Sequence, residues 1–272
     1  MFETHRACGN AEIAVVRRAY QCVGMGLMDA GTRVRSNSMH SRLARRGGRP
    51  GWQRCVLADN LDSPNVPAIA MEIYIVRHTT PDAPHDVCYG RQDVGLADSF
   101  EREAAEALDK LLQFTAGSDG PSGSSRSFPA TQVYCSPLQR CARLARVLSA
   151  YPPKIDGRLI EMDFGNWEMQ RWDQIPPEQM AAWEHDPVHF APPDGETAAE
   201  MAHRARSFAD ELGRLDDTSR VLVVSHGGPI HMLVAALLDA PLHVGVRLHV
   251  DYASVTRIDL SAGKPKLICL NR

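Results

Sequence analysis

The 272-residue chain lacks several features that mark common classes of protein. Its seven cysteines form no Cys-x-x-Cys pair, so reduced thiols in a cytoplasmic protein are the simplest interpretation. No apolar run approaches the roughly 20 residues that a membrane-spanning helix needs. The N-terminus lacks the short apolar segment of a secretory signal. No Gly-rich loop ends in Lys followed by Ser or Thr, which excludes a P-loop for nucleotide phosphates.

Charge is divided unevenly along the chain. Residues 1–70 carry ten arginines, no lysine and five acidic residues, a balance of +5. The remainder carries 20 basic and 28 acidic residues, a balance of −8. Duplex nucleic acid is bound largely by basic side chains that neutralise its phosphates, so this acidic body argues against a nucleic-acid partner. Any site for an anion must therefore be a local basic pocket.

Residues 1–70 differ from the rest in pattern as well as in charge. Their hydrophobic periodicity is weak, and Met71 stands directly before the first run typical of a strand. We interpret the segment as a disordered Arg-rich extension, or as the result of a start assigned upstream of the natural one at Met71. An Arg-rich targeting or binding arm and a small accessory domain are the alternatives. One folded domain is expected at 71–272.

From residue 71 onward, short apolar runs alternate with helical patterns. Ser99 is predicted to cap the first helix, and Thr197 and Glu200 have the spacing of a capping box. The alternation predicts an α/β fold, a three-layer sandwich in which helices flank a mainly parallel sheet, with a small cap segment at about 151–195. Strands are expected at 73–76, 132–135 and 220–225, helices at 99–114, 137–150, 177–184, 197–215 and 229–238, and a C-terminal hairpin at 254–270.

Two of the strand patterns deliver a histidine at their C-terminal ends. The first run is followed by Arg77 and His78, and the run 221–224 is followed by Ser225, His226 and two glycines. Ligands of open α/β sheets bind beyond the carboxyl ends of the strands, so these side chains are expected to share one pocket. Either motif alone also fits a surface turn or a core histidine. Together, and beside a guanidinium, they indicate a site for a phosphoryl group.

A third strand end contributes Arg140, which lies in the first turn of the following helix and can reach back over the sheet edge. Burial and nearby positive charge both favour the neutral form of an imidazole, which is the form that a nucleophile requires. His78 is therefore predicted to attack phosphorus. His226 is predicted to donate to the charge that spreads over the phosphoryl oxygens.

A departing alkoxide needs a proton, and a carboxylic acid in the cap is the natural source. Glu161 lies between apolar neighbours, which should raise its pKa and keep it protonated. Asp163 and Glu168 are rival donors, although solvated carboxylates are their simpler interpretation.

Other chemistries fit the sequence less well. Ser225 does not lie in a Gly-x-Ser-x-Gly elbow. Cys135 and Arg140 are separated by four residues, whereas the loop of a cysteine phosphatase has five. His226 and His231 are five positions apart with no third ligand nearby, so no metal site is expected.

Taken in order, these motifs resemble those of the histidine phosphatase (phosphoglycerate mutase-like) superfamily. The resemblance implies a phosphohistidine intermediate on His78 and a phosphate pocket made by Arg77, Arg140 and His226. It also implies that Glu161 is the proton donor and that neither a metal nor an organic cofactor is used. The matching segments are 75–78, 136–140, 161–168 and 224–228, within about 72–260.

Within the superfamily, residues 76–82 and 88–94 most resemble the α-ribazole phosphatase branch of cobalamin synthesis, which dephosphorylates a nucleotide-like phosphomonoester. Thr79 stands where the superfamily usually has Gly, and Cys141 replaces a common Ala. Thr79 and Gly227 are expected to help bind the substrate. Arg91 either reaches the pocket or forms a surface salt bridge.

The sequence thus predicts a phosphatase that hydrolyses a small-molecule phosphomonoester, such as α-ribazole 5′-phosphate. Phosphoryl transfer of the phosphoglycerate mutase type and a broad-specificity sugar phosphatase are alternatives, and a non-catalytic phospho-ligand module is a third. The cap side chains Trp167, Trp172, Trp183 and Met169 could stack on the leaving group, but a small core within the cap is their simpler interpretation.

Overall fold

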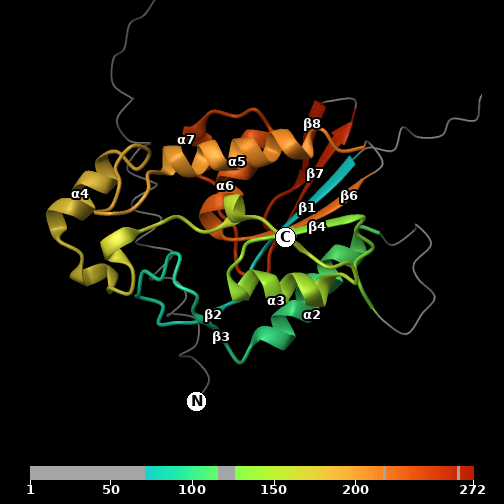
Figure 1. Ribbon diagram of the computed structural model, residues 1–272, viewed down its shortest axis with the longest axis horizontal. Helices are drawn as coiled ribbons and strands as arrows, with labels where there is room; N and C mark the ends of the chain where they lie inside the picture. Colours follow the sequence, from blue (N-terminus) through green and yellow to red (C-terminus); the bar gives the residue numbers. More distant parts are fainter. Residues whose placement is uncertain (1–70, 116–125, 217–218, 262–263) are drawn as a thin grey trace, which may run out of the picture.

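The computed structural model describes residues 71–115, 126–216, 219–261 and 264–272 (Figure 1). The predicted N-terminal extension, 1–70, lies outside the described residues. Of the helices in the described ranges, none combines the length and the apolar character that crossing a membrane requires.

Within the described residues, a six-stranded sheet occupies the centre of the molecule, in the order β5-β4-β6-β1-β7-β8 (Figure 1). Neighbouring strands are parallel from β5 to β1, and β7 and β8 form an antiparallel hairpin that pairs with β1. This topology confirms the mainly parallel sheet and the C-terminal hairpin. The strands are β1 (Met71–Arg77), β4 (Gln132–Cys135), β5 (Lys154–Ile155), β6 (Arg220–Ser225), β7 (Val255–Ser261) and β8 (Lys264–Cys269). A separate small hairpin, β2 (Pro81–Asp82) with β3 (Gly95–Leu96), was not predicted.

Helices cover both faces of the sheet and complete the three predicted layers (Figure 1). Helices α2 and α3 pack on one face and α5 and α6 on the other, while α4 lies in the cap at one end of the molecule. The helices are α2 (Phe100–Gln113), α3 (Gln139–Leu148), α4 (Pro177–His185), α5 (Ala198–Leu212), α6 (Gly227–Leu237) and α7 (Leu242–Gly245), with 3-10 turns η2 (Gly157–Leu159), η3 (Gly165–Trp167) and η4 (Trp172–Gln174).

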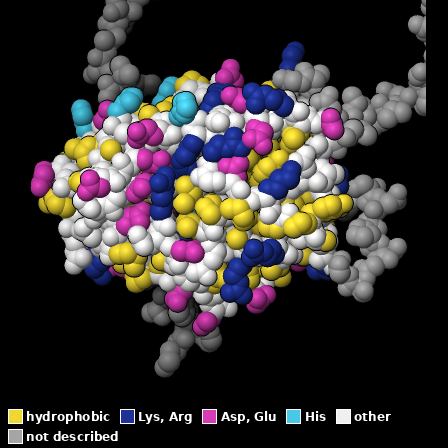
Figure 2. Space-filling model, in the orientation of Figure 1, with side chains coloured by type: hydrophobic (Ala, Val, Ile, Leu, Met, Phe, Trp, Pro, Cys, Tyr) yellow, Lys and Arg dark blue, Asp and Glu magenta, His cyan; other side chains and the backbone are white. Residues whose placement is uncertain are grey.

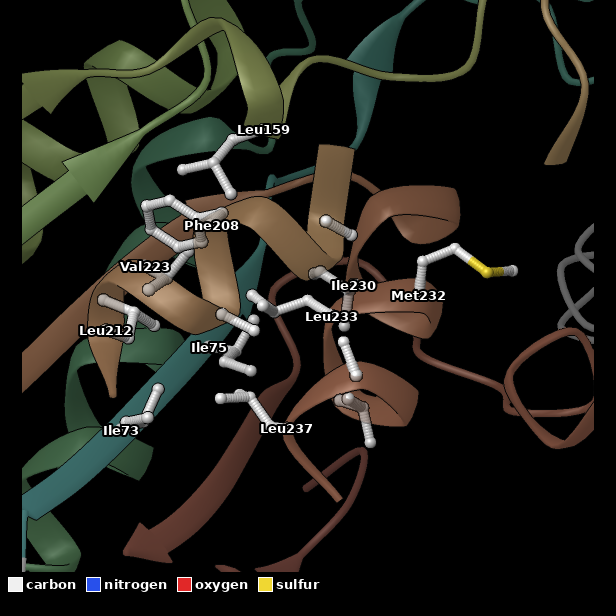
Figure 3. Close-up of a cluster of buried hydrophobic side chains, with 14 of the residues drawn as sticks. Ile73, Ile75, Leu159, Phe208, Leu212, Val223, Ile230, Met232, Leu233 and Leu237 are labelled. Carbon is white, nitrogen blue, oxygen red and sulfur yellow. The ribbon is translucent and has the colours of Figure 1, made fainter. Parts of the chain in front are cut away.

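Alternating side chains of the central strands fill two cores. Ile73 and Ile75 of β1 lie in the core under α5 and α6, whereas Tyr74 and Val76 lie in the core under α2 and α3. Figure 3 shows the first core, in which Phe208 packs near the strand side chains. Because a shift of one residue would exchange the two faces, burial on both sides fixes the register of β1 and therefore the position of its C-terminal end.

Three helix starts differ from the prediction, and one is that of α3, which begins at Gln139 rather than at residue 137. Ser99 makes no side-chain capping bond, because its backbone is already helical (φ −75°, ψ −4°) rather than extended as a capping residue requires. Helix α6 begins at Gly227, two residues earlier than predicted, so His226 occupies its N-cap position. The predicted capping box of Thr197 and Glu200 is present at the start of α5.

The cap contains its own small hydrophobic core. Trp167 and Trp183 are buried there with ring centres 5.7 Å apart, and Trp172 packs against them, which confirms the core interpretation of these side chains. Met169 is exposed instead. Figure 2 shows acidic side chains gathered over the end of the molecule that carries α4, in keeping with the acidic composition of the body.

Candidate active site

The strand order β4-β6-β1 brings the three predicted strand ends together. Arg77 of β1 pairs with Ser225 of the parallel neighbour β6, so His78 and His226 are the next residues on adjacent strands. Their imidazole centres lie 5.0 Å apart. On the other side of β6, β4 continues into Ser136 and then into α3. The convergence that the sequence indicated is therefore present.

His78 has a defined tautomer. Its Nδ1 lies 2.7 Å from the carbonyl oxygen of Thr79, and because a carbonyl only accepts, Nδ1 must carry the proton. The lone pair is then on Nε2, which is buried and has no hydrogen-bond partner among the described residues. Burial lowers the pKa of His78 well below its usual value, and the charges of Arg140 and Arg77 lower it further. The imidazole is neutral, as a nucleophile requires.

Arg140 is fully buried, and protein acceptors fix its guanidinium in place. Its Nη1 and Nη2 donate to the carbonyl oxygens of Gln92 and Gly90, each at 2.8 Å, and its Nε lies 3.3 Å from Nδ1 of His226. The planar fork of an arginine can hold several acceptors at once in this way. Arg140 therefore ties the loop at 90–92 to the end of the sheet.

Both ring nitrogens of His226 are engaged within the protein. Since the guanidinium of Arg140 only donates, Nδ1 of His226 is an acceptor and its proton lies on Nε2, which donates to Ser136 Oγ at 2.7 Å. Cys141 Sγ is 3.4 Å from the same nitrogen. Burial, followed by the neighbouring His78 and Arg140, lowers the pKa of His226 well below its usual value. Donation from His226 to a phosphoryl oxygen would require this N–H to turn away from Ser136.

Arg77 lies at the junction between the buried histidines and the open side of the site. Its Nη1 donates to the Val250 carbonyl at 2.8 Å, and its guanidinium carbon is 3.9 Å from the centre of the Tyr252 ring. Gly227, the first residue of α6, lies next to Arg77, and an added Cβ there would be in ordinary van der Waals contact with the guanidinium, at 3.6 Å. The start of α6 and Arg77 thus face the same space.

Glu161 follows the turn η2 and is partly buried beside α6. Its Oε1 accepts from the Met162 N–H at 2.8 Å, and a Cβ at Gly228 would lie only 2.6 Å from this oxygen, so a side chain there would displace the carboxyl group. Burial raises the pKa of Glu161, as predicted, although the Met162 N–H and the charges of Arg77 and Arg140 act in the opposite direction.

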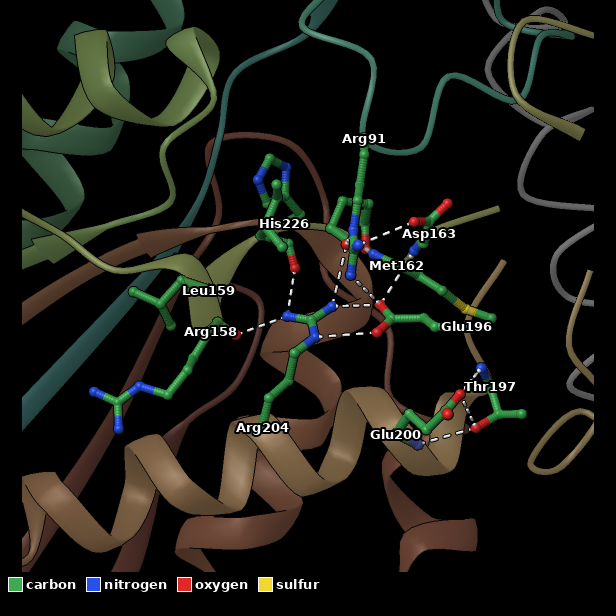
Figure 4. A network of polar contacts seen from close by, with 12 residues as sticks. Arg91, Arg158, Leu159, Met162, Asp163, Glu196, Thr197, Glu200, Arg204 and His226 are labelled. Carbon is green, nitrogen blue, oxygen red and sulfur yellow. Dashed lines mark hydrogen bonds and ion pairs between the residues drawn. The ribbon is translucent and has the colours of Figure 1, made fainter. Parts of the chain in front are cut away.

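Two arginines fix the backbone of Glu161, and Figure 4 shows both of them, Arg91 and Arg204, directed toward Glu196. Arg91 Nε and Arg204 Nη2 donate to its carbonyl oxygen at 3.0 and 3.1 Å, and both guanidiniums pair with Glu196, at 3.0 and 2.7 Å. Arg91 also pairs with Asp163 at 3.0 Å. Of the two alternatives for Arg91, the structure shows the salt bridge. Its guanidinium supports the backbone of Glu161.

The rival proton donors are occupied by other partners. Asp163 pairs with Arg91, and Glu168 accepts from the Arg91 backbone N–H at 2.7 Å and from Gln92 Nε2 at 2.9 Å. Of these three carboxyl groups, Glu161 is the one whose side chain lies beside Gly228, in the first turn of α6. Within the described ranges, no cluster of three or more His, Cys, Asp or Glu side chains could hold a metal ion.

A cavity of about 860 Å³ opens beside these residues. Arg77, Glu161 and Gly227 line its inner end, and Trp172 and Trp183 of the cap line another part of its wall. His78, Arg140 and His226 have no exposed surface. The cavity thus provides room for a leaving group beside the buried His78, Arg140 and His226.

The sequence profile of the histidine phosphatase superfamily, branch 1, matches residues 73–272. The chain belongs to the histidine phosphatase superfamily. By this membership it is an enzyme, a phosphatase of the histidine phosphatase type.

Relatives of this histidine phosphatase include proteins named alpha-ribazole phosphatase and probable phosphoglycerate mutase. The adenosylcobalamin/alpha-ribazole phosphatase of Escherichia coli is 31% identical over 207 residues, which cover 74% of this chain and 96% of the relative. A protein of Erwinia tasmaniensis named "Probable phosphoglycerate mutase GpmB" is 28% identical over 198 residues, 70% of this chain and 85% of the relative. The crystal structure of the alpha-ribazole phosphatase from Shigella flexneri has a TM-score of 0.63 at 27% identity and covers 74% of this chain and 96% of its own.

Several groups of this histidine phosphatase site were not identified from the sequence. Tyr252 and the Val250 carbonyl belong to the segment between α7 and β7, which has no periodic pattern that could place it against Arg77. Arg204 lies on α5, where an arginine is ordinarily a solvated helix residue. Glu103 accepts from the N–H and hydroxyl of Thr80 at 2.7 and 3.0 Å, a long-range contact without a local signal.

Proposed function

We propose that this histidine phosphatase hydrolyses a small phosphomonoester in two steps through a phosphohistidine on His78. The bond from His78 Nδ1 to the Thr79 carbonyl carries the proposal, because it leaves the Nε2 lone pair beside Arg77, Arg140 and His226. In the first step Nε2 attacks phosphorus and the ester oxygen leaves. In the second step water attacks phosphorus, the N–P bond breaks and His78 is restored.

Arg77 and Arg140 hold the phosphoryl oxygens and balance the charge that develops on them. The protein bonds of Arg140 orient its guanidinium before the substrate arrives, so little ordering remains for the reaction itself. His226 orients Arg140 through its Nδ1, and its Nε2–H can exchange Ser136 for a phosphoryl oxygen. Thr79 and Gly227 contribute through the backbone, the first by its carbonyl and the second by its close approach to Arg77.

Glu161 supplies and then recovers one proton. As a carboxylic acid it protonates the departing ester oxygen, and as the resulting carboxylate it accepts a proton from the attacking water. The raised pKa keeps the acid form populated to higher pH than an ordinary carboxyl would allow. The bonds from Arg91 and Arg204 to the Glu161 carbonyl fix the position from which the proton is delivered.

Replacement of Glu161 by glutamine should slow phosphoenzyme formation from an alkyl phosphate by roughly 10²–10³-fold. The same variant should react with p-nitrophenyl phosphate at within about threefold of the wild-type rate, because that leaving group needs no proton. For the wild type, the alkyl phosphate rate should fall as the pH rises through the raised pKa of Glu161, and the variant should lack this decrease. Single-turnover rapid quench between pH 5 and 9 measures both rates.

Glu178→Gln, an exposed carboxyl in α4, is the matched control and should leave both rates unchanged. Equal losses for both substrates in Glu161→Gln would contradict the role as proton donor.

The substrate that we propose is a nucleotide-like phosphomonoester such as α-ribazole 5′-phosphate. The motif resemblance and the relatives named alpha-ribazole phosphatase support it. The cavity supports it further, because a volume of about 860 Å³ is large enough for a ring system. The mutase-type relative makes phosphoryl transfer to a second hydroxyl of a phosphoglycerate the competing function.

A panel of phosphomonoesters tests this choice. α-Ribazole 5′-phosphate should have a kcat/KM at least about tenfold above those of ribose 5-phosphate and phosphoserine, because only the former fills the cavity with an aromatic group. The panel includes 3-phosphoglycerate, with free phosphate and isomerised product measured separately. A higher kcat/KM for a sugar phosphate would overturn the proposed substrate, and isomerised product in excess of free phosphate would identify a mutase.

A further inference from the structure

Two tyrosines, Tyr89 and Tyr252, join two distant segments beside the buried His78. Tyr89 belongs to the segment between β2 and β3, and Tyr252 to the segment between α7 and β7. Their hydroxyl oxygens lie 2.9 Å apart and share a hydrogen bond. Both side chains line the cavity, and the Tyr252 ring centre is also 5.4 Å from that of His78. The bonded pair thus borders both the cavity and the buried histidine.

Each tyrosine ring also faces one of the two arginines at the phosphate pocket. The guanidinium carbon of Arg77 is 3.9 Å from the centre of the Tyr252 ring, and that of Arg140 is 5.2 Å from the centre of the Tyr89 ring. Contacts of this kind attract a cation to the face of an aromatic ring. The pair therefore spans the two guanidiniums that would hold a phosphoryl group.

The backbone next to Tyr252 is anchored to His78. Ala253 is buried and adopts a positive φ of 53°, which is uncommon for a residue with a side chain. Its N–H donates to the His78 carbonyl at 3.2 Å, and its carbonyl accepts from Lys110 at 3.1 Å. Ala253 thus has a strained backbone that is held by two hydrogen bonds. It restrains the backbone of the neighbouring Tyr252, so we expect Tyr252 to move mainly through its side chain.

His78 itself has no exposed surface, yet a nucleophile must come within about 3–3.5 Å of the phosphorus it attacks. We propose that Tyr89 and Tyr252 form a gate between the cavity and His78. The hydroxyl bond holds the gate closed, and a phosphomonoester opens it as its phosphoryl oxygens replace the tyrosine rings at Arg77 and Arg140. The inference rests on the proposed function, because that function requires the phosphoryl group to reach His78.

The rate at which His78 is chemically modified measures how often the gate is open, and the measurement requires no catalytic turnover. Diethyl pyrocarbonate acylates accessible neutral imidazoles, and the 73% exposed side chain of His189 serves as an internal reference in the same full-length chain. Tyr89→Phe and Tyr252→Phe keep the rings and remove the hydroxyl bond. Each should raise the rate at His78 relative to His189 by about fivefold, the change in the open fraction expected from the loss of one neutral hydrogen bond.

The double variant separates a shared bond from two independent effects. Because both single changes break the same bond, the Tyr89→Phe and Tyr252→Phe combination should also give about fivefold rather than about twenty-fivefold. Tyr151→Phe, at a 57% exposed position, is the control and should match the wild type. Thermal unfolding of every variant checks that the rates refer to folded protein.

The gate would be overturned if His78 in both single variants is modified, relative to His189, at rates within about twofold of the wild type. It would also be overturned if the double variant shows the product of the two single effects. In kinetics with p-nitrophenyl phosphate, the open variants should show a KM lowered by the same factor. A wild type that forms no phosphoenzyme would contradict the proposed function alone, because the modification rates test the gate independently of catalysis.

Discussion

Replacement of His78 by alanine is expected to lower kcat by roughly four to six orders of magnitude, the effect found when the nucleophile of a covalent mechanism is removed. The wild type should accumulate an acid-labile, alkali-stable phosphoenzyme within the first turnover, and His78→Ala should form none. Rapid quench with a labelled phosphomonoester measures both quantities. Binding of inorganic phosphate should persist in the variant, because Arg77 and Arg140 remain in place.

The control for this change is His243→Ala, which removes an exposed imidazole on α7 and should leave kcat unchanged. Turnover by His78→Ala at more than about 1% of the wild-type rate would contradict the phosphohistidine mechanism. If His78→Ala loses both phosphate binding and turnover, the imidazole ring of His78 is needed for the structure of the site. The phosphate-binding measurement therefore separates the chemical role of His78 from a structural one.

The reactivity of this group depends on opposing influences that the structure makes visible. Burial and the two neighbouring guanidiniums both disfavour an imidazolium at position 78, while the Thr79 carbonyl favours the proton on Nδ1. The same guanidiniums also lower the pKa of Glu161, but there they favour the charged form, the carboxylate. Of the influences on this carboxyl group, burial is the one that raises its pKa. The site thus combines a neutral imidazole with a carboxyl group whose pKa is raised, a pairing that suits the transfer of a phosphoryl group and a proton.

Sequence patterns were sufficient for the parts of the site that follow strand ends. Arg77 is the last residue of β1, His78 and His226 directly follow the buried parallel strands β1 and β6, and burial on both faces fixes the register of β1 with β6. A periodic pattern of this kind determines both the position of each residue along the chain and its position in space. The convergence of these residues could therefore be predicted before any coordinate was known.

The remaining parts of the site depend on contacts for which the sequence carries no local signal. Tyr252 reaches Arg77 from a segment without periodicity, and its bond to Tyr89 joins residues 163 positions apart. The side chain of Arg91 was left with two alternatives, because nothing nearby in the sequence shows that Glu196 lies within 3.0 Å of it. The failed capping role of Ser99 has a similar origin: Ser99 lies in a turn closed by the bond from the Phe100 N–H to the Ala97 carbonyl at 3.0 Å, and its backbone is already helical.

Replacement of Arg140 by alanine is expected to lower kcat/KM by about 10³–10⁴-fold, because the loss removes both the proposed phosphate ligand and the group that bonds to His226 Nδ1. It should also lower the free energy of unfolding by about 2–5 kcal/mol, since the carbonyl oxygens of Gly90 and Gln92 lose a buried partner. Arg140→Lys keeps the charge but cannot bond both carbonyls and His226, so a loss in kcat/KM of about 10²-fold is expected.

Arg146→Ala is the matched control for Arg140, because it removes an exposed guanidinium from the same helix, α3. Steady-state kinetics, inhibition by inorganic phosphate and urea unfolding, measured on all three variants, separate the two effects. If Arg140→Ala loses stability while its kcat/KM stays within about tenfold of the wild type, the guanidinium acts as a brace for the 90–92 loop and not as a phosphate ligand. If Arg140→Lys retains full kcat/KM, charge alone is sufficient, and the fixed fork seen in the structure has no part in the transition state.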